Sequence, residues 1–508
     1  MLSSHVCLVS SIASSIARKA SETQAFAHTR RGVGVALEDS APRPYATILR
    51  MRCLLVLALL SVAAPAQTQS GVAPLKMATF ADHPYMGWSS WSFLRSKPTE
   101  AKIKAQAEAL IAAKLPELGY RYINIDAAWS DGYDDHGIPK PNLTAFPDGM
   151  AGMAAWLHSR GLRFGLYLTP GVRPNLYQAN PTIAGTNVHI DEITDTSLPG
   201  ATLRGNYKID YTKPAARIYV QSIVDQFARW KVDFVKLDFV GPGGGNLPAD
   251  NREDVRQWHQ AILHSGRPIW LELSNWLSID QAKFWRANAN GWRIENDIEC
   301  YACGHSTDPA IKDNLTDWST KVVDRFSDVR EWIPYAGPGG WNDLDSLEIG
   351  NGNKDGVTPA ERQSMFILWS ISCAPLYLGT DLTHMDPDDL KIISNRDIIA
   401  IDQRGIPAMP LDIQSLRNPG PNGEPLRQAW MTLYPDGSAI LALFNLGTDA
   451  ASIHFDWREV DALRNTHFSQ YPPRLTDLIT HQESPPSQGV GVTLVPHGST
   501  IFRVTAAK

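Results

Sequence analysis

Strand-like apolar segments alternate with amphipathic segments along the chain from about residue 78. The strand-like segments are 83–88, 121–125, 163–168, 232–239, 268–273, 291–296, 333–336 and 375–378. The helical segments between them are 100–115, 149–160, 215–230, 254–264, 279–289, 314–327 and 359–372. Thr358 and Pro359 suit the N-cap and first position of the last helix. Eight alternations predict an α/β fold, a (β/α)8 TIM barrel, over residues 78–404.

The pattern changes beyond residue 404. Helical spacing gives way to short alternating segments at 428–433, 439–444, 452–455, 490–494 and 500–504. Asn445-Leu446-Gly447 and Pro435-Asp436-Gly437 are turn signals between them. These features predict a C-terminal antiparallel β-sandwich domain over residues 405–508.

The long segment 169–206 interrupts the alternation within the barrel. It is rich in Pro, Thr and Asn, which favour turns and loops. Connections of this length are uncommon inside a compact domain. We therefore expect an insertion over one end of the barrel.

The first 66 residues have the character of a leader. Met51 and Arg52 precede an apolar run at 53–64, and small residues follow it. This pattern predicts a signal peptide over residues 51–66, and hence a secreted or periplasmic protein. The run is too short to anchor the mature chain in a membrane. Residues 1–50 have neither a domain nor a signal pattern, so we expect translation to start at Met51.

Composition and charge narrow the function. With 508 residues, of which 43% are hydrophobic and 20% charged, the chain fits a soluble enzyme of two or three domains. Residues 1–66 carry seven Lys+Arg and three Asp+Glu, so the net charge changes from −6 to −10 without them. An acidic surface argues against nucleic acid or an anionic membrane as a partner. The oligomeric state is left open, a homo-oligomer included.

The few cysteines leave two alternatives for one pair. Cys300 and Cys303 form a CxxC sequence, which suits either a small disulfide loop or a metal site. A zinc site needs further ligands at suitable spacing, and only His305 lies near. Cys373 lies in an apolar run, and we expect it to be a buried thiol.

Acidic and aromatic residues gather where the predicted strands end. The sequence VDFVKLDFVGPGGG, residues 232–245, places Lys236 and Asp238 at the end of a buried strand. A barrel enzyme builds its site from the loops at the carboxyl ends of its strands. Any one acid is more often a cap or turn residue, and the tryptophans could belong to the core, but the whole set predicts one pocket. Its members are Trp88, Trp91, Asp126, Tyr167, Lys236, Asp238, Glu272, Arg293, Asp297, Asp343 and Asp345.

Two carboxylates across a pocket are the groups that glycoside hydrolysis requires. One attacks the anomeric carbon or activates water, and the other protonates the leaving oxygen. Lys236 lies two residues before Asp238 and points to the same side of the strand, so its charge favours an ionised nucleophile there. The glutamates flanking Asp297 would raise its pKa, which suits a general acid, whereas Arg293 would lower it.

Eight motifs come in the same order as in the family-27 glycoside hydrolases, the melibiase-like α-galactosidases and α-N-acetylgalactosaminidases. They are MGWSSW, YINIDAAW, FGLYLTPG, FVKLDFV, WLELSNW, WRIENDI, GPGGWNDLDSLEIGN and ISCAPLYLGTDL. The chain resembles this family over roughly residues 80–405, and more weakly in the C-terminal β domain. The resemblance implies a retaining double-displacement mechanism that needs no metal or organic cofactor.

The resemblance also implies roles for single residues. Asp238 matches the nucleophile of the family's K-x-D motif, and Asp297, four residues after the matching Arg293, matches the acid/base. The other matches are contacts to sugar: Lys236 to hydroxyls, Glu272 and Arg293 near the 2-hydroxyl, Asp126 as the first of two sugar-binding acids, and Trp91, Tyr167 and Asp345 on the pocket wall.

Several positions depart from the family's pattern. Ala127 stands where the second sugar-binding acid is usual, and a lost charge-assisted hydrogen bond costs about 1.5–3 kcal/mol. Phe239 and Val240 stand where Asn and Cys are common, so the matching disulfide cannot form. Segment 169–206 is longer than usual. Glu272, in contrast, is retained, which favours a substrate with a free 2-hydroxyl over an N-acetylated one.

We expect a retaining exo-glycosidase that hydrolyses terminal α-D-galactosyl residues of oligo- or polysaccharides. Family members with altered pockets cleave β-L-arabinopyranosides or release isomaltose from dextran, and Ala127 with the insertion keeps these activities open. The alternative of another class is a carbohydrate-binding protein on an inactive scaffold. Such a protein would keep the aromatic sugar contacts but not the paired acids.

Overall fold

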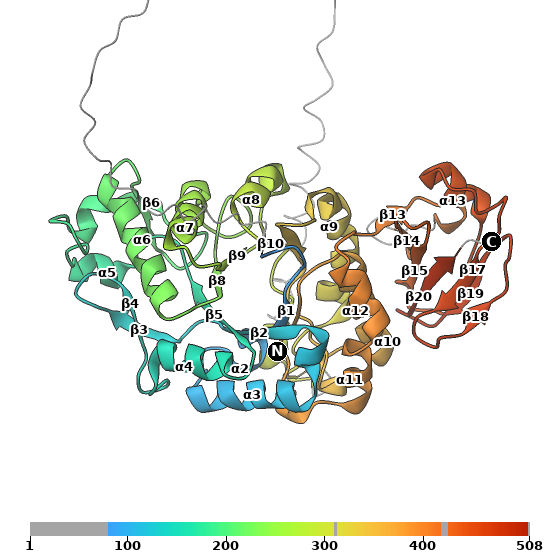
Figure 1. The fold of residues 1–508 in the computed structure, drawn as a ribbon, viewed down its shortest axis with the longest axis horizontal. Helices are drawn as coiled ribbons and strands as arrows, with labels where there is room; N and C mark the ends of the chain where they lie inside the picture. Colours follow the sequence, from blue (N-terminus) through green and yellow to red (C-terminus); the bar gives the residue numbers. More distant parts are fainter. Residues whose placement is uncertain (1–79, 309–311, 418–424, 506–508) are drawn as a thin grey trace, which may run out of the picture. The chain divides into compact units, whose positions relative to one another are not determined.

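The computed structural model describes residues 80–308, 312–417 and 425–505, which belong to one compact unit (Figure 1). The predicted leader and the start at Met51 lie outside these residues. Within the described part of the chain, no helix combines the length and apolar character needed to span a bilayer.

Eight parallel strands form one sheet and confirm the predicted barrel. In chain order they are β1 Met86–Ser89, β2 Tyr120–Ile125, β5 Arg163–Leu168, β8 Phe234–Leu237, β9 Trp270–Leu273, β10 Gly291–Arg293, β11 Trp341–Asp343 and β12 Leu376–Leu378. Each pairs with its neighbour in this order, and β12 pairs with β1. Leu347, just after β11, bridges Leu378 in parallel and closes the ring.

Helices follow most strands, as predicted. They are α3 Glu100–Ala112, α4 Gly149–His158, α6 Pro214–Arg229, α7 Arg252–Ser265, α8 Ala282–Asn288, α9 Arg325–Trp332 and α10 Pro359–Ile371, with α11 Pro387–Ile393 and α12 Arg396–Gln403 after β12. The predicted cap of α10 is confirmed by two reciprocal bonds. Thr358 Oγ1 accepts from the Glu361 N–H at 3.3 Å, and the Glu361 carboxylate accepts from the Thr358 N–H at 2.6 Å.

Two predicted elements are wrong. Segment 333–336 is not a strand: Ile333–Tyr335 forms the 3₁₀ helix η7, because Pro334 has no N–H to give to a central strand. The seventh strand is β11, in the segment expected to be a loop. Segment 314–327 is not one helix either. It contains the π-helical turn η6 Trp318–Val322, which begins at the side-chain cap of Asp317, followed by the start of α9.

Aromatic side chains fill the barrel beneath the strand ends. The Tyr85 ring packs against Phe234, Trp270 and Tyr377, with ring centroids 5.0, 5.2 and 5.4 Å away. The same cluster contains Cys373, which is fully buried, as predicted. This packed interior makes the floor on which the pocket residues stand.

The insertion after β5 has regular structure of its own. It contains α5 Pro174–Ala179, the 3₁₀ helix η3 Ile190–Ile193 and β6 Thr194–Pro199. Strand β6 pairs in antiparallel fashion with β7 Tyr207–Ile209. Because the insertion begins where β5 ends, it lies at the end of the barrel that carries the pocket.

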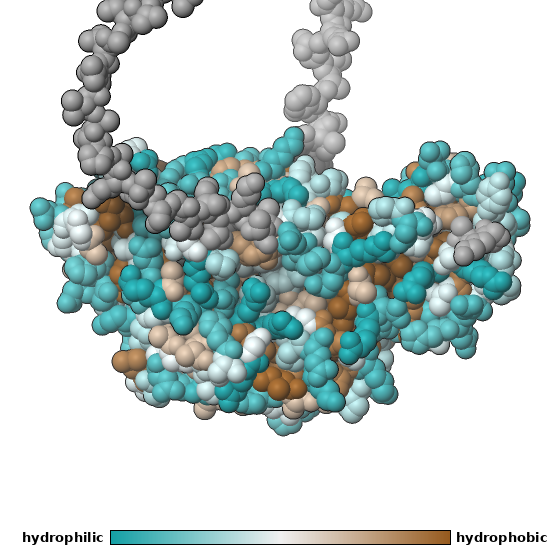
Figure 2. Space-filling model, viewed as in Figure 1, coloured by the Kyte–Doolittle hydropathy of each residue, from teal (hydrophilic) through white to brown (hydrophobic). Residues whose placement is uncertain are grey.

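The C-terminal part is an antiparallel β-sandwich, as predicted. One sheet contains β13 Met409–Leu411, β14 Arg427–Leu433, β15 Ala439–Asn445, β20 Ser499–Thr505, β17 Arg474–Asp477 and β18 Glu483–Ser484; the other pairs β16 Ala451–Asp456 with β19 Gly489–Leu494. Apolar side chains of the two sheets share one core. The sequence did not reveal β13, β17, β18 or helix α13 Trp457–Arg464. On the face shown in Figure 2, hydrophilic residues cover most of the described surface.

Candidate active site

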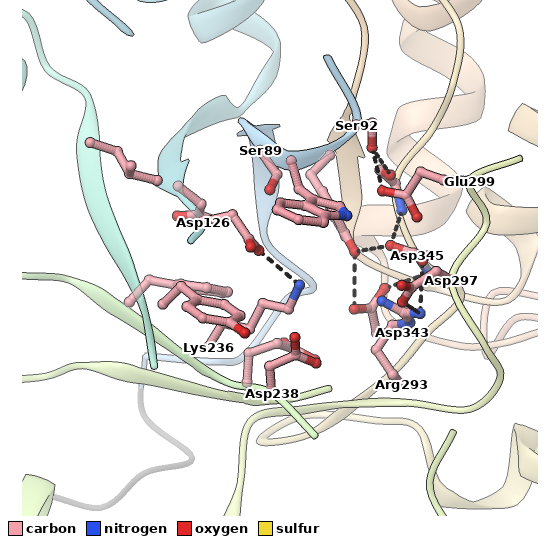
Figure 3. Close-up of a pocket in the computed structure, with 18 of the residues that line it drawn as sticks. Ser89, Ser92, Asp126, Lys236, Asp238, Arg293, Asp297, Glu299, Asp343 and Asp345 are labelled. Carbon is pink, nitrogen blue, oxygen red and sulfur yellow. Dashed lines mark hydrogen bonds and ion pairs between the residues drawn. The ribbon is translucent and has the colours of Figure 1, made fainter. Parts of the chain in front are cut away.

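A pocket at the carboxyl ends of the barrel strands brings most of the predicted residues together (Figure 3). Its lining includes Trp91, Asp126, Tyr167, Lys236, Asp238, Glu272, Arg293, Asp297, Asp343 and Asp345. Trp88 does not belong to it: this side chain is fully buried in the core and its indole N–H donates to the Thr380 carbonyl at 2.8 Å. In Figure 3, Asp126 and Lys236 lie on one side of the pocket and Arg293, Asp297 and Asp345 on the other.

On the β8 side, Lys236 forms an ion pair with Asp126. The Lys236 ammonium lies 2.9 Å from Asp126 Oδ2, and the Ala127 N–H donates to Oδ1 at 2.7 Å. The Asp126 N–H in turn donates to the Ser90 hydroxyl at 2.9 Å. Asp126 is 4% exposed. A carboxylate with both oxygens bound by fixed donors is oriented before any ligand arrives.

Asp238 lies directly after β8, and hydrogen bonds fix both its backbone and its carboxylate. Its N–H donates to the Leu168 carbonyl at 2.8 Å, and its Oδ1 accepts from the Phe239 N–H at 2.9 Å. The glycine-rich turn that follows packs closely on the loop after β9: a Cβ at Gly243 would lie 1.9 Å from the Trp276 carbonyl oxygen. Only glycine permits that approach, which accounts for part of the GPGGG sequence.

The pKa of Asp238 is raised above its usual value. Burial contributes most, the negative charges of Asp297 and Asp126 add to it, and the charge of Lys236 opposes it. Lys236 therefore lowers the pKa of Asp238, as predicted, but the raising effect of burial is larger. Its closest carboxylate is Asp126, whereas it acts on Asp238 only through space.

On the β10 side, Arg293 binds two carboxylates at once. Its guanidinium lies 2.7 Å from Asp297 Oδ1 and 2.8 Å from Asp345 Oδ2. Asp345 also accepts from the Ile298 N–H at 2.8 Å and from the Tyr377 hydroxyl at 2.9 Å. Asp345 holds a left-handed backbone conformation with φ of 80°, a strain that recurs at functional sites.

The pKa of Asp297 is lowered well below its usual range. Burial raises it, but the charges of Arg293 and Lys236 and a hydrogen bond from the Tyr301 hydroxyl outweigh burial. Of the two opposing influences that the sequence suggested, Arg293 and the flanking glutamates, the lowering by Arg293 therefore prevails. The direct contact with Arg293 is stronger than the influence of acids that do not touch Asp297.

Glu272 lies in the floor of the pocket, 1% exposed. Its Oε2 accepts from the Trp270 indole N–H at 2.8 Å, and Oε1 has no hydrogen-bond partner among the described residues. A Cβ at Gly291 on the neighbouring strand would lie 2.0 Å from Oε2, so glycine there makes room for the carboxyl group. Burial, followed by the charge of Asp343, raises its pKa well above the usual value, which favours a protonated Glu272.

Sequence reasoning missed several polar residues of the pocket lining, among them Arg204, Glu299 and Tyr301. Arg204 comes from the insertion, and its guanidinium lies 5.0 Å from the Phe239 ring centroid. Tyr301 belongs to the CxxC segment, whose two cysteines are joined in a disulfide. The position of this segment three residues after Asp297 was the signal that could have revealed Tyr301.

A cluster of acids beside Arg293 has the spacing of a cation site. Oxygens of Asp297, Glu299 and Asp345 lie within 4.8 Å of one another. Two of these carboxylates already bind the Arg293 guanidinium. The Glu299 carboxylate accepts from Ser92 Oγ at 2.8 Å and has a strongly raised pKa owing to burial and the Asp345 charge. The Arg293 guanidinium, the Ser92 hydroxyl and protonation of Glu299 therefore suffice to balance the negative charge of these three acids.

A (β/α)8 barrel whose strand ends bring paired carboxylates and cations into one pocket has the site that glycoside hydrolases use. Residues 84–191 and 208–404 match the melibiase family model described as alpha galactosidase A. The chain belongs to this family, the family-27 glycoside hydrolases. It is a glycoside hydrolase. The unmatched stretch 192–207 falls almost entirely within the insertion.

Relatives of known function agree with the family. An α-galactosidase of Cyamopsis tetragonoloba is 29% identical over 384 residues, 75% of this chain and 77% of that protein. Alpha-galactosidase 3 of Arabidopsis thaliana is 31% identical over 376 residues, 74% of this chain and 71% of that protein. Among solved structures, a family-27 β-L-arabinopyranosidase from Geobacillus stearothermophilus, in complex with arabinose, has a TM-score of 0.73 and 25% identity and covers 86% of this chain and all of that one.

Proposed function

We propose that the protein is an exported retaining exo-glycosidase that hydrolyses terminal α-D-galactosyl residues of oligo- or polysaccharides. Asp238 serves as the nucleophile and Asp297 as the acid/base. The observation that supports this best is the pocket itself, where these carboxyls reach one space from β8 and from the loop after β10, each beside a cation. The α-galactosidases among the relatives support galactose as the sugar that is released.

The reaction proceeds in two displacements. In the first, an Asp238 oxygen bonds to the anomeric carbon while the glycosidic C–O bond breaks and Asp297 gives its proton to the leaving oxygen. In the second, Asp297 takes a proton from water, whose oxygen attacks the anomeric carbon and releases the Asp238 carboxylate. The two carboxyls therefore need one proton between them at the start of each cycle.

Sugar binding has to redistribute that proton. In the substrate-free pocket the pKa of Asp238 is raised and that of Asp297 is lowered, so the proton resides by preference on the nucleophile. Sugar hydroxyls that bind Asp126 compete with its ion pair to Lys236. More of the Lys236 charge then acts on Asp238, which favours the ionised nucleophile that the first displacement requires.

A second candidate is cleavage of β-L-arabinopyranosides. Ala127 replaces an acid that the family uses on the sugar, and its N–H donates to Asp126 Oδ1. The arabinopyranosidase of Geobacillus stearothermophilus is also among the similar structures. Release of isomaltose from dextran and sugar binding without turnover are the remaining alternatives.

A panel of aryl glycosides tests the substrate. We expect kcat/KM for 4-nitrophenyl α-D-galactoside to exceed the values for the β-L-arabinopyranoside and the α-D-glucoside, with the Asp238→Ala variant, purified in parallel, as the control for contaminating activity. Proton NMR of the first product should show the α-anomer, as retention requires. Preference for either other glycoside would refute the α-galactosidase assignment. Calorimetric sugar binding without hydrolysis would support a binding protein.

Export is tested separately. The predicted signal peptide should be removed, so that N-terminal sequencing of the secreted protein begins close to residue 67. A mature terminus near residue 1 would contradict both the signal peptide and the start at Met51.

A further inference from the structure

A four-residue disulfide loop places a tyrosine on the Asp297 carboxylate. Cys300 and Cys303 are bonded to each other, and Tyr301 lies between them. The Tyr301 hydroxyl lies 2.6 Å from Asp297 Oδ2, and the Trp91 indole nitrogen lies 2.8 Å from the same hydroxyl. Three pocket residues thus form one chain of hydrogen bonds.

The chemistry of the donors fixes the direction of this chain. An indole N–H can only donate, so the Tyr301 oxygen accepts from Trp91. The single hydroxyl hydrogen is then free to point at Asp297. Since Arg293 donates to Oδ1 and Tyr301 to Oδ2, both oxygens of Asp297 accept hydrogen bonds. Both contacts favour the ionised form.

Of the two donors to Asp297, only Tyr301 lies where its side chain can move away from the carboxylate. Arg293 is 2% exposed and is held in turn by Asp345. Tyr301 is 45% exposed and stands at the rim of the pocket. When Asp297 is protonated, one of its oxygens carries the hydrogen and donates it, so that oxygen no longer needs a donor beside it. Oδ2 is that oxygen, because its partner can move toward solvent.

We propose that Tyr301 is a positioning residue that holds Asp297 ionised and oriented in the free enzyme and yields Oδ2 to the leaving-group oxygen when substrate binds. The proposal rests on the acid/base role proposed above for Asp297. The proton balance is closed: the proton shared by the two carboxyls moves to Oδ2, passes to the leaving oxygen as the glycosidic bond breaks, and is replaced from the attacking water.

The disulfide constrains the loop backbone that carries the Tyr301 side chain. The loop is short, and its first N–H donates to the Leu315 carbonyl at 2.7 Å, which anchors one end. The Arg95 guanidinium lies 5.0 Å from the Tyr301 ring centroid and covers it. Reduction by dithiothreitol, which gives two protein thiols and the cyclic disulfide of the reagent, would free the loop from its constraint.

Other charges face Asp297 and Tyr301 and have to stay constant in a test. They are Lys236 and Asp238 at the end of β8, Arg293 at the end of β10, Glu299 in the loop that follows, Lys321 in η6, whose ammonium donates to the Asp297 carbonyl, Asp345 after β11 and Arg95 after β1. Tyr301→Phe changes none of them. It removes one hydroxyl and keeps the ring over which Arg95 lies.

The pH dependence of kcat/KM tests the proposal. The two carboxyls titrate as a pair, and in the free enzyme Asp297 has the lower pKa, so the acidic limb follows Asp297 and the alkaline limb follows Asp238. Loss of a hydrogen bond to the Asp297 carboxylate raises its pKa, so Tyr301→Phe should move the acidic limb to higher pH by about one unit. The Tyr471→Phe variant, which alters an exposed tyrosine of the C-terminal part, should leave the profile unchanged.

The disulfide is tested by the same profile. Dithiothreitol-treated enzyme and the Cys300→Ser/Cys303→Ser variant should show the shift of Tyr301→Phe. Tyr301→Phe itself should not shift further on reduction, because the two changes remove the same hydrogen bond. A second shift on reduction of Tyr301→Phe would overturn the role of the loop.

An acidic limb of Tyr301→Phe that coincides with the wild-type limb, or moves to lower pH, would overturn the role of Tyr301. Asp297→Asn separates this failure from that of the proposed function. If Asp297→Asn keeps wild-type kcat/KM on an oligosaccharide, the acid/base assignment fails. If Asp297→Asn loses activity while the Tyr301→Phe profile is unchanged, only the role of Tyr301 fails.

Discussion

The two sides of the pocket carry similar residues and opposite proton affinities. On the β8 side, Lys236 binds Asp126 directly and reaches Asp238 only through space, so burial keeps the pKa of Asp238 raised. On the β10 side, Arg293 binds Asp297 directly and lowers its pKa. A cation a few residues before an acid therefore does not determine how that acid ionises. What decides is which carboxylate the cation touches.

The largest effect is expected from removing the carboxylate of the β8 side. Asp238→Ala leaves no group to attack the anomeric carbon, so kcat should fall by at least about 10⁴-fold. Steady-state hydrolysis of an aryl galactoside measures the loss. Asp449→Ala, a change at an exposed aspartate of the C-terminal part, is the matched control and should behave as wild type. Near-normal turnover by Asp238→Ala would remove Asp238 from the mechanism.

On the β10 side, the effect should depend on the leaving group. Asp297→Ala removes proton donation, worth about 10²- to 10⁴-fold for a sugar leaving group. A 4-nitrophenolate leaves with little help, so its glycoside should lose much less in the first displacement. The ratio of kcat/KM for the two substrates is the measurement, and Glu295→Gln, at a neighbouring acid that does not contact Asp297 in this structure, is the control. An equal loss on both substrates would contradict an acid role.

Removing the cation of the β8 side should raise the pKa of Asp238 further. Lys236 opposes the upward shift, so Lys236→Met removes a positive charge on the same strand that favours the ionised nucleophile. Because Asp238 has the higher pKa of the two carboxyls, the alkaline limb of kcat/KM should move to higher pH. Lost hydrogen bonds to the sugar should lower kcat/KM by roughly ten- to a hundredfold.

Lys283→Met, a change at an exposed lysine on α8, provides the control for that experiment. An alkaline limb of Lys236→Met that stays in place or moves to lower pH would show that Lys236 does not tune Asp238.

The smallest effect concerns the missing acid beside Asp126. Ala127→Asp restores a carboxylate next to a residue that already binds Lys236. A new charge-assisted hydrogen bond to a galactosyl hydroxyl should improve the ratio of α-galactoside to β-L-arabinopyranoside hydrolysis by about tenfold. Parallel kinetics on the two aryl glycosides measure the ratio. An unchanged ratio would mean that position 127 does not select the sugar.

The alternation of the barrel could be predicted because most strands are apolar runs between helices with a clear polar face. The seventh strand could not. Strand β11 is only Trp-Asn-Asp, and its polar side chains are acceptable inside the barrel because of distant partners. The Asn342 side chain accepts from the Trp292 indole and donates to the Trp332 carbonyl, both at 2.8 Å. The local sequence pattern does not predict hydrogen bonds to residues so far away in the chain.

For the site, the sequence predicted which residues meet, since the carboxyl ends of parallel barrel strands lie at one end of the sheet. It did not predict how they titrate. The charges of Arg293 and Lys236 and the hydroxyl of Tyr301 lower the pKa of Asp297, and Tyr301 lies in a disulfide loop beyond the end of the predicted strand 291–296. For Trp88 the sequence left pocket and core as alternatives, and its indole donates to a core carbonyl.

Azide rescue of the two alanine variants tests the division of roles between the two sides most directly. Azide can enter the space left by either carboxylate and attack the anomeric carbon from that side, and NMR reads the configuration of the glycosyl azide. With Asp238→Ala, the product should have the configuration opposite to that of the substrate. With Asp297→Ala, azide should attack the glycosyl-enzyme and give the retained configuration. The reverse pair of outcomes would contradict the assignment of Asp238 as nucleophile and Asp297 as acid/base.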